Sequence, residues 1–154
     1  FINPNFINGD KEYISNFLKK KVHLPAYKKP MNWNQISDLH RRGHLIGAHT
    51  MDHVRVSEIS DIKLMHYQIG ECKKEIKSAI NVDCDYFAFT YGHPERDFNL
   101  NSVLIAENYY DNIFSASNWR NYFSYDEKVL NRRHCEPYWP ANHINYFLSK
   151  HISY

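Results

Sequence analysis

Two histidines four residues apart, His49 and His53, form the segment of this sequence best suited to chemistry. Residues 49–53 read H-T-M-D-H, and on one helical turn or in a tight loop both imidazoles can face the same cation. Neutral imidazole is a good ligand for zinc and other borderline divalent metals. The chain contains ten histidines, so such a pair also arises by chance. Its position after the apolar run 44–48, which predicts a buried strand, favours a metal site.

A second candidate is the turn at Tyr91 and Gly92, which follows the hydrophobic run 86–89. A glycine allows the backbone to turn sharply and leaves neighbouring N–H groups free to face a ligand. Such donors can stabilise a developing oxyanion. An ordinary turn at the end of a strand explains the same pattern, so both interpretations stay open here.

A third candidate is the polar segment Arg132, Arg133 and His134, which follows a predicted strand at 128–130. Two arginines and a histidine can anchor a carboxylate in an active site, and they can equally form solvated surface charge. His134 beside Cys135 is not a credible nucleophile–base pair, because adjacent residues of an extended chain point to opposite faces.

Helix and strand patterns alternate along the chain, which predicts an α/β fold. Helices are expected at 10–21, 32–42, 99–109 and 141–150, and a long one from Ser57 or Ser60 to Ile80. Strands are expected at 1–7, 44–48, 86–89, 112–116 and 128–130. In parallel α/β sheets and barrels the chemistry lies at the carboxyl ends of the strands, and all three candidate segments fall at such ends.

Composition bounds the class of protein. The 154 residues, 43% of them hydrophobic and 16% aromatic, predict a single globular domain, 1–154, without a transmembrane segment. Basic residues outnumber acidic ones by only 19 to 17, which is too balanced to indicate a nucleic-acid partner. Cys72, Cys84 and Cys135 form no C-x-x-C pair, which favours three reduced thiols over a disulfide framework or a zinc knuckle.

The motifs together resemble the polysaccharide deacetylase family with the NodB-type homology domain. The resemblance rests on F-I-N-P-N-F at the start, on W-x-Q-I-x-x-L-x-x-x-G-H-x-I-G-A-H-T-x-D-H ending at His53, and on F-A-F-T-Y-G at 87–92. It implies an irregular (β/α) barrel and removal of acetyl groups from N-acetylated sugars. It also implies a divalent metal, commonly zinc, held by one aspartate and by His49 and His53.

The resemblance assigns further roles. A Tyr91–Gly92 backbone N–H would face the oxyanion, and we expect Gly92 and Arg132 to contact substrate. The family's late L-x-H motif, which carries the catalytic acid, is not recognisable here, and His134 at a predicted strand end is our stand-in for it. The family's aspartate pair, a metal ligand and the general base, has no counterpart here. Because the chain opens directly in an apolar run at Phe1, we interpret it as a domain lacking its first strand, and expect this piece to be inactive alone.

Two other functions remain open on the sequence alone. One is a non-catalytic, carbohydrate-associated domain that keeps the fold, and the other is a metal-dependent hydrolase of a different amide or ester. The resemblance implies a location at the cell envelope or outside the cell, whereas three unpaired cysteines favour a reducing compartment. The oligomeric state is not predicted.

Overall fold

The computed structural model describes residues 1–25, 28–117, 123–132 and 138–149. The elements, in chain order, are α1 (Pro4–Asn8), α2 (Lys11–Lys20), α3 (Trp33–Arg41), the 3₁₀ turn η1 (Val56–Glu58), α4 (Ile62–His66), the π-helical segment η2 (Tyr67–Glu71), α5 (Cys72–Ile80), β1 (Tyr86–Ala88), α6 (Leu100–Glu107), β2 (Asn112–Phe114), β3 (Phe123–Ser124), β4 (Val129–Leu130) and α7 (Ala141–Ser149).

The strands form an open sheet in the order β1-β2-β4-β3. β1, β2 and β4 are parallel, and β3 is antiparallel to β4. Single parallel bridges extend the sheet beyond β1, from Phe87 to Ala48 and from Ala48 to Ile2. The α/β class is therefore confirmed, but the described strands do not close into a barrel.

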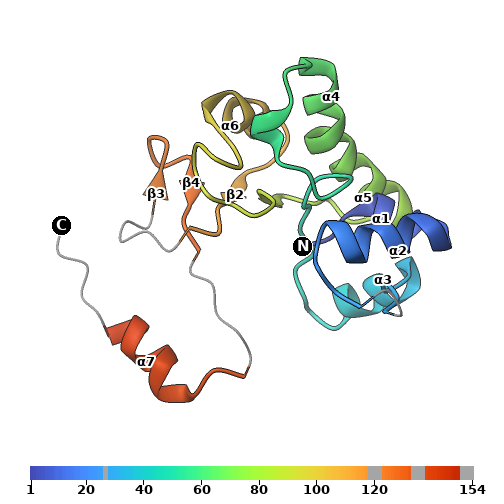
Figure 1. Cartoon of the computed structure of the whole chain (residues 1–154), viewed down its shortest axis with the longest axis horizontal. Coiled ribbons are helices and arrows are strands. Elements are labelled where there is room, and N and C mark those ends of the chain that lie inside the picture. Colours follow the sequence, from blue (N-terminus) through green and yellow to red (C-terminus); the bar gives the residue numbers. More distant parts are fainter. Residues whose placement is uncertain (26–27, 118–122, 133–137, 150–154) are drawn as a thin grey trace.

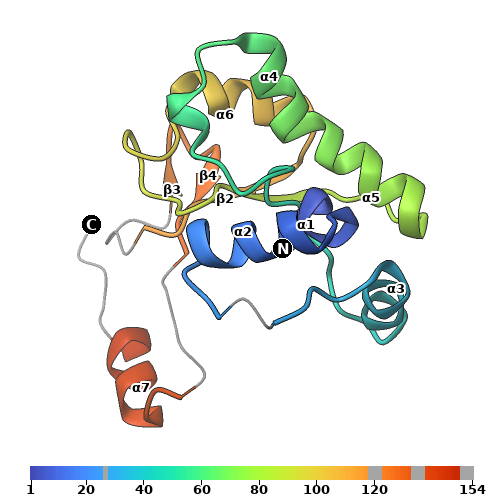
Figure 2. The same cartoon turned by 45° about the vertical axis from the view of Figure 1, so that its right-hand side comes forward.

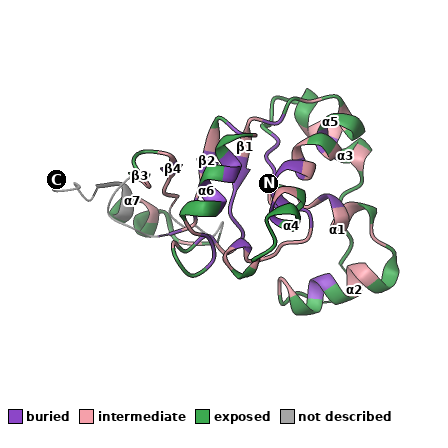
Figure 3. Ribbon diagram, turned by 90° about the horizontal axis from the view of Figure 1, so that it is seen from above, coloured by how far each residue is buried: buried purple, intermediate pink, exposed green. Residues whose placement is uncertain are grey.

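α4, α5 and α6 lie along one side of the sheet (Figures 1 and 2), and α1 packs against α5, with a hydrogen bond from Asn8 to Glu75 (2.9 Å). α7 lies apart from the other elements in both views. Buried residues gather around β1 and β2 (Figure 3). The core includes Phe87, stacked on Tyr110 with ring centroids 4.9 Å apart, and Phe89, stacked on Phe98 at 4.1 Å.

Local sequence signals explain several helix ends. The Asn32 side chain accepts from the Gln35 N–H and the Gln35 side chain accepts from the Asn32 N–H, a reciprocal cap that starts α3. Gly43 follows this helix with a φ of +92°, as predicted. The Asp10 side chain accepts from the Tyr13 N–H at the start of α2, and Asn99 and Ser102 form a second reciprocal cap at the start of α6.

Three sequence predictions were wrong in part. Residues 1–7 are not a strand, because Pro4 starts α1 in the position where proline is tolerated, and only Ile2 joins the sheet. In the 44–48 run only Ala48 forms a bridge. The long helix starts after Asp61, its N-cap, rather than at Ser57 or Ser60.

That long helix contains a π-helical segment, η2, which shifts the helix face. Ile69, Cys72 and Ile76 are fully buried as expected, but Ile62 is 57% exposed. The shift also turns Gln68 into the protein interior. Cys72 and Cys84 are buried and unpaired, whereas Cys135 lies outside the described residues.

No helix in the described part of the chain is both long and apolar enough to cross a membrane.

Candidate active site

The histidine pair lies at the carboxyl end of the sheet. Ala48 pairs with β1, since its N–H donates to the Tyr86 carbonyl (2.8 Å) and its carbonyl accepts from the Ala88 N–H (3.0 Å). This pairing carries the next residue, His49, against the end of β1, where its Nδ1 lies 2.7 Å from the Ala88 carbonyl oxygen. The His49 and His53 ring centroids are 5.0 Å apart and the ring planes meet at 74°.

The loop that joins the two histidines has a demanding backbone. Thr50 and His53 have φ values of +63° and +52°, in the left-handed region that residues other than glycine rarely adopt. Asn3 supports this loop from the N-terminal segment, because its side-chain amide donates to the carbonyls of His49 and Thr50. Thr50 is fully buried. Contacts from outside the loop thus hold the two rings beside each other.

Asp52, between the histidines, is occupied by other partners. Its Oδ1 accepts from the Tyr13 hydroxyl (2.5 Å) and the Asn5 amide (2.8 Å), and its Oδ2 accepts from the Gln68 amide (2.7 Å). The Gln68 Oε1 in turn accepts from the Asp52 N–H (3.1 Å). Asp52 therefore ties the loop to α1, α2 and η2, and the hydrogen bond to Asp52 adds to burial in raising the pKa of Tyr13.

The Tyr91–Gly92 turn lies against the pair. The Tyr91 ring meets the His53 ring edge-on, with centroids 4.9 Å apart, and its hydroxyl donates to the Lys21 carbonyl (3.2 Å). Tyr91 and Gly92 have φ values of +59° and +75°. The Gly92 N–H donates to the Thr90 carbonyl (2.6 Å), whereas the Tyr91 N–H has no acceptor within the described ranges. Of the two amides, the Tyr91 N–H is the one without a hydrogen-bond partner among the described residues.

Arg132 lies near His49, beyond the end of β4. Its Nε donates to the Ser115 carbonyl (2.9 Å), and its guanidinium lies 4.6 Å from the Phe1 ring centroid and 5.6 Å from that of Phe114. Burial lowers the pKa of Arg132. His134 and Arg133 lie outside the described residues.

Both histidines are neutral near pH 7. Burial lowers the pKa of His49 to about 3, with further contributions from His53 and from the charge of Arg132. Burial also lowers the pKa of His53 to about 4. A carbonyl oxygen can only accept, so the His49 Nδ1 carries the proton and its Nε2 keeps a free lone pair.

The His53 ring has a nitrogen that nothing satisfies. Its Nδ1 is buried and makes no hydrogen bond to any described residue. An unsatisfied buried nitrogen is costly, and neutral imidazoles are metal donors, so this pair fits a divalent cation. Within the described ranges, no group of three histidine, cysteine or acidic side chains could complete such a site.

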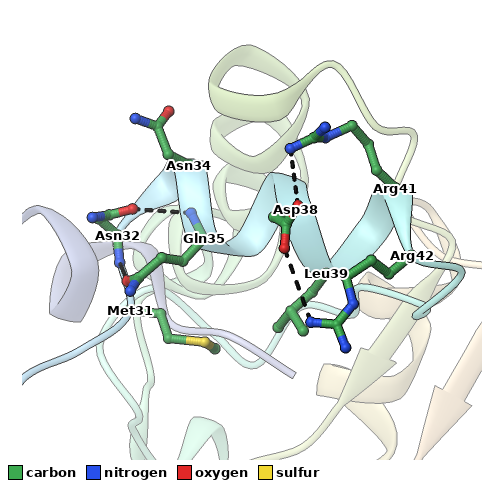
Figure 4. Close-up of a pocket in the computed structure, with 8 residues that line it drawn as sticks. All are labelled: Met31, Asn32, Asn34, Gln35, Asp38, Leu39, Arg41 and Arg42. Carbon is green, nitrogen blue, oxygen red and sulfur yellow. Dashed lines mark hydrogen bonds and ion pairs between the residues drawn. The ribbon is translucent and has the colours of Figure 1, made fainter.

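A surface pocket of about 490 Å³ lies along α3 (Figure 4). Its lining includes Met31, Leu39 and Arg42. None of the candidate catalytic, substrate-binding or metal-binding residues lines it, and two ion pairs from Asp38 to Arg41 and Arg42 span its wall. We therefore assign the chemistry to the strand ends and not to this pocket.

Sequence reasoning missed the residues that support the site. Gln68, Arg55 and Asp97 contact candidate segments or one another and belong to no motif found in the sequence. Asn3 lies in the F-I-N-P-N-F motif, but its support of the histidine loop was not predicted. The one available signal was polarity inside an apolar pattern, at Gln68 within the long amphipathic helix.

The amino-acid sequence of this chain matches the model of a known family over more than half of its length. Residues 6–109 match the family model described as polysaccharide deacetylase. The chain belongs to the polysaccharide deacetylase family. The resemblance inferred from the motifs is thereby confirmed. No curated protein sequence matches the chain.

Solved deacetylase structures share the fold. A polysaccharide deacetylase from Bacillus cereus superposes with a TM-score of 0.63 at 11% identity, covering 80% of this chain and 38% of that one. A Streptococcus pyogenes deacetylase in complex with acetate gives 0.64 at 15%, covering 80% and 53%. A de-N-acetylase from Aggregatibacter actinomycetemcomitans gives 0.61 at 15%, covering 87% and 62%. The chain thus spans less than two thirds of each of these structures.

The lowered histidine pKa values predict a pH-dependent stability of the metal-free protein. Between about pH 4 and 6.5 the unfolded chain binds protons at His49 and His53 that the folded chain does not. The free energy of unfolding should therefore fall as the pH falls through this window, by up to about 1.4 kcal/mol per pH unit for each histidine. Urea unfolding with a chelator present measures this slope. His49→Gln should make the slope shallower, and an unchanged slope in this variant would contradict the prediction.

The Tyr91–Gly92 turn gives a second prediction. A Cβ on Gly92 would lie 2.3 Å from the Ala116 N atom, and its φ of +75° disfavours any side chain. Gly92→Ala should therefore lower the free energy of unfolding by about 1–3 kcal/mol and displace the turn. Tyr91→Phe removes only the hydroxyl bond to Lys21 and serves as the control. Equal destabilisation by the two changes would contradict this account of the turn.

Proposed function

We propose that this chain is the metal-binding part of a hydrolase that removes acetyl groups from an N-acetylated saccharide. The observation that carries the proposal is the pair of neutral, adjacent imidazoles of His49 and His53, packed against the Tyr91–Gly92 turn. Membership of the polysaccharide deacetylase family supports the reaction class. The structural neighbours support the fold on which such a site is built.

In this proposal His49 and His53 hold a divalent cation, with zinc the first candidate. A bound cation of this kind polarises an amide carbonyl and lowers the pKa of its water. The hydrogen bond from His49 Nδ1–H to the Ala88 carbonyl orients the ring and makes its other nitrogen more basic. A carboxylate ligand and a general base would come from residues other than those described, because Asp52 is engaged elsewhere.

The other residues act on the substrate. The Tyr91 N–H is the proposed donor to the oxyanion that forms when the acetamide carbonyl is attacked. Arg132, stacked on Phe1 and half-buried, offers its remaining guanidinium N–H groups to a polar substituent of the saccharide. Gly92 lets the backbone approach the substrate. His134 is proposed as the acid that protonates the departing amine.

A non-catalytic carbohydrate-binding domain is the second candidate. The observation that favours it is that the described residues supply two metal donors and no third. The two candidates differ in whether the sugar's acetyl group is removed once the metal site is complete.

The chain alone should bind zinc weakly and release no measurable acetate from N-acetylglucosamine oligomers. Two neutral imidazoles leave the cation's charge uncompensated. The described residues place no general base beside the pair, and the loss of such a base costs about 10²–10⁴-fold in rate. Isothermal titration with ZnCl₂ should give binding that His49→Ala and His53→Ala abolish and that His40→Ala retains.

A longer version that includes an upstream aspartate pair tests the reaction. It should bind zinc more tightly than the chain alone and release acetate in a zinc-dependent manner. Tight zinc binding and saccharide binding without acetate release would instead support the non-catalytic domain. Zinc binding that survives His49→Ala would contradict the metal site itself.

A further inference from the structure

We propose that Arg55 is a positioning residue: held by the buried Asp97, it fixes the Tyr91 ring against His53 and thereby sets the direction of the Tyr91 N–H. This inference rests on the proposed function, because it assigns a role within the same site. It concerns two residues, Arg55 and Asp97, that lie outside the motifs found in the sequence.

Arg55 joins the two segments of the site. It follows His53 by two residues, and its guanidinium carbon lies 4.4 Å from the centroid of the Tyr91 ring. The same ring meets the His53 ring at 4.9 Å. Tyr91 is therefore in contact with the cation of Arg55 and with the imidazole of His53, a candidate metal ligand.

Asp97 fixes the direction of Arg55. The Asp97 side chain is fully buried, and its Oδ1 accepts from the Arg55 Nε at 2.9 Å. The Asp97 carboxylate also accepts from the Arg96 guanidinium (2.8 and 2.9 Å) and from the His93 N–H (2.9 Å). Burial alone would raise the pKa of Asp97, but these hydrogen bonds lower it below its ordinary value, so the carboxylate is charged.

The segment 54–57, which contains Arg55, and the segment 90–97, which contains Tyr91, are also linked by hydrogen bonds that do not involve Tyr91. The Thr90 hydroxyl donates to the Val54 carbonyl, the Ser57 hydroxyl donates to the Arg96 carbonyl (2.6 Å), and the Ser57 N–H donates to the Asp97 carbonyl (3.2 Å). With the loops already linked, the Arg55–Asp97 pair does not need to hold them together. What it adds is a fixed cation over one aromatic ring.

Tyr91 needs such support because of its backbone. Its φ of +59° is unfavourable for a side chain of this size, and such conformations persist only where surrounding contacts determine them. The ring has three restraints, namely Arg55, His53 and the hydroxyl bond to Lys21. Of these, the guanidinium stacked on the ring is the one that a buried carboxylate holds in place. Loss of Arg55 should let Tyr91 relax and turn its N–H away from the site.

The test uses Co²⁺ as the metal probe and the backbone amides as a second readout. Arg55→Met should weaken Co²⁺ binding about tenfold, as loss of a residue that supports a metal ligand does, and shift the amide NMR signals of Tyr91 and Gly92. Asp97→Asn should do the same by releasing Arg55, and the double variant should lose no more than either single one.

Lys73→Met is the matched control. Lys73 also pairs with a carboxylate, Asp85 (3.1 Å), and also lies over a ring, that of Tyr110 (5.6 Å), but at the opposite end of β1. The Lys73→Met variant should have a lower free energy of unfolding, with the same Co²⁺ affinity and the same Tyr91 amide signals as the unaltered chain. Arg55→Lys keeps the charge but not the planar group, so it should fold and still shift those signals.

The outcomes separate this inference from the proposed function. Unchanged Tyr91 and Gly92 signals in folded Arg55→Met or Arg55→Lys would overturn the positioning role, whatever the metal does. Equal effects of Lys73→Met and Arg55→Met would overturn it too, because the loss would then be one of general stability. If the unaltered chain binds no Co²⁺ but the Tyr91 signals still shift in Arg55→Met, the metal site fails and the positioning of Tyr91 stands.

Discussion

The site depends on the parallel pairing of Ala48 with β1. Two backbone hydrogen bonds, to Tyr86 and from Ala88, fix where the chain leaves the sheet, and the next residue is His49. The same end of β1 leads within three residues to Tyr91. Because parallel strands end at one edge, a single pairing brings together two segments about 40 residues apart in the chain. A one-residue slip would turn the side chains of Ala48 and His49 each to the face opposite its present one.

The sequence predicted the elements whose causes are local. The helices capped by Asp10, Asn32 and Asn99 begin where expected, since a cap and the three residues after it suffice. The run 44–48 was harder, because a strand exists only if a partner pairs with it, and here only Ala48 has one. The π-helical segment η2 leaves the spacing of the apolar residues nearly unchanged, so this spacing could not predict it.

The candidate site likewise contains residues that local motifs predict and residues that only tertiary contacts bring to it. His49, His53, Tyr91 and Gly92 follow motifs and lie together, and the structure adds their neutral charge and the unpaired nitrogen of His53. Their supporting partners are tertiary. Nothing near Asp52 in sequence indicates that Tyr13 and Asn5 donate to it, and nothing near Arg55 points to Asp97. Spacing identifies groups that act on a ligand, whereas contacts between distant segments decide how those groups are held.

Electrostatics explains why the support must be polar and the pair must be neutral. Two imidazoles with centroids 5.0 Å apart cannot both be protonated cheaply while buried, so the folded chain keeps both as free bases. The buried charge of Asp97 is paired with Arg55, whereas the charge of Arg132 helps to lower the pKa of His49. In the proposed metal site, the neutral rings of His49 and His53 would offer a cation lone pairs rather than protons. The positive φ values of Thr50, His53 and Tyr91 are unfavourable for residues with side chains, and such conformations persist only where surrounding contacts determine them. The polar contacts to Asn3 and Arg55 from outside these turns are contacts of that kind.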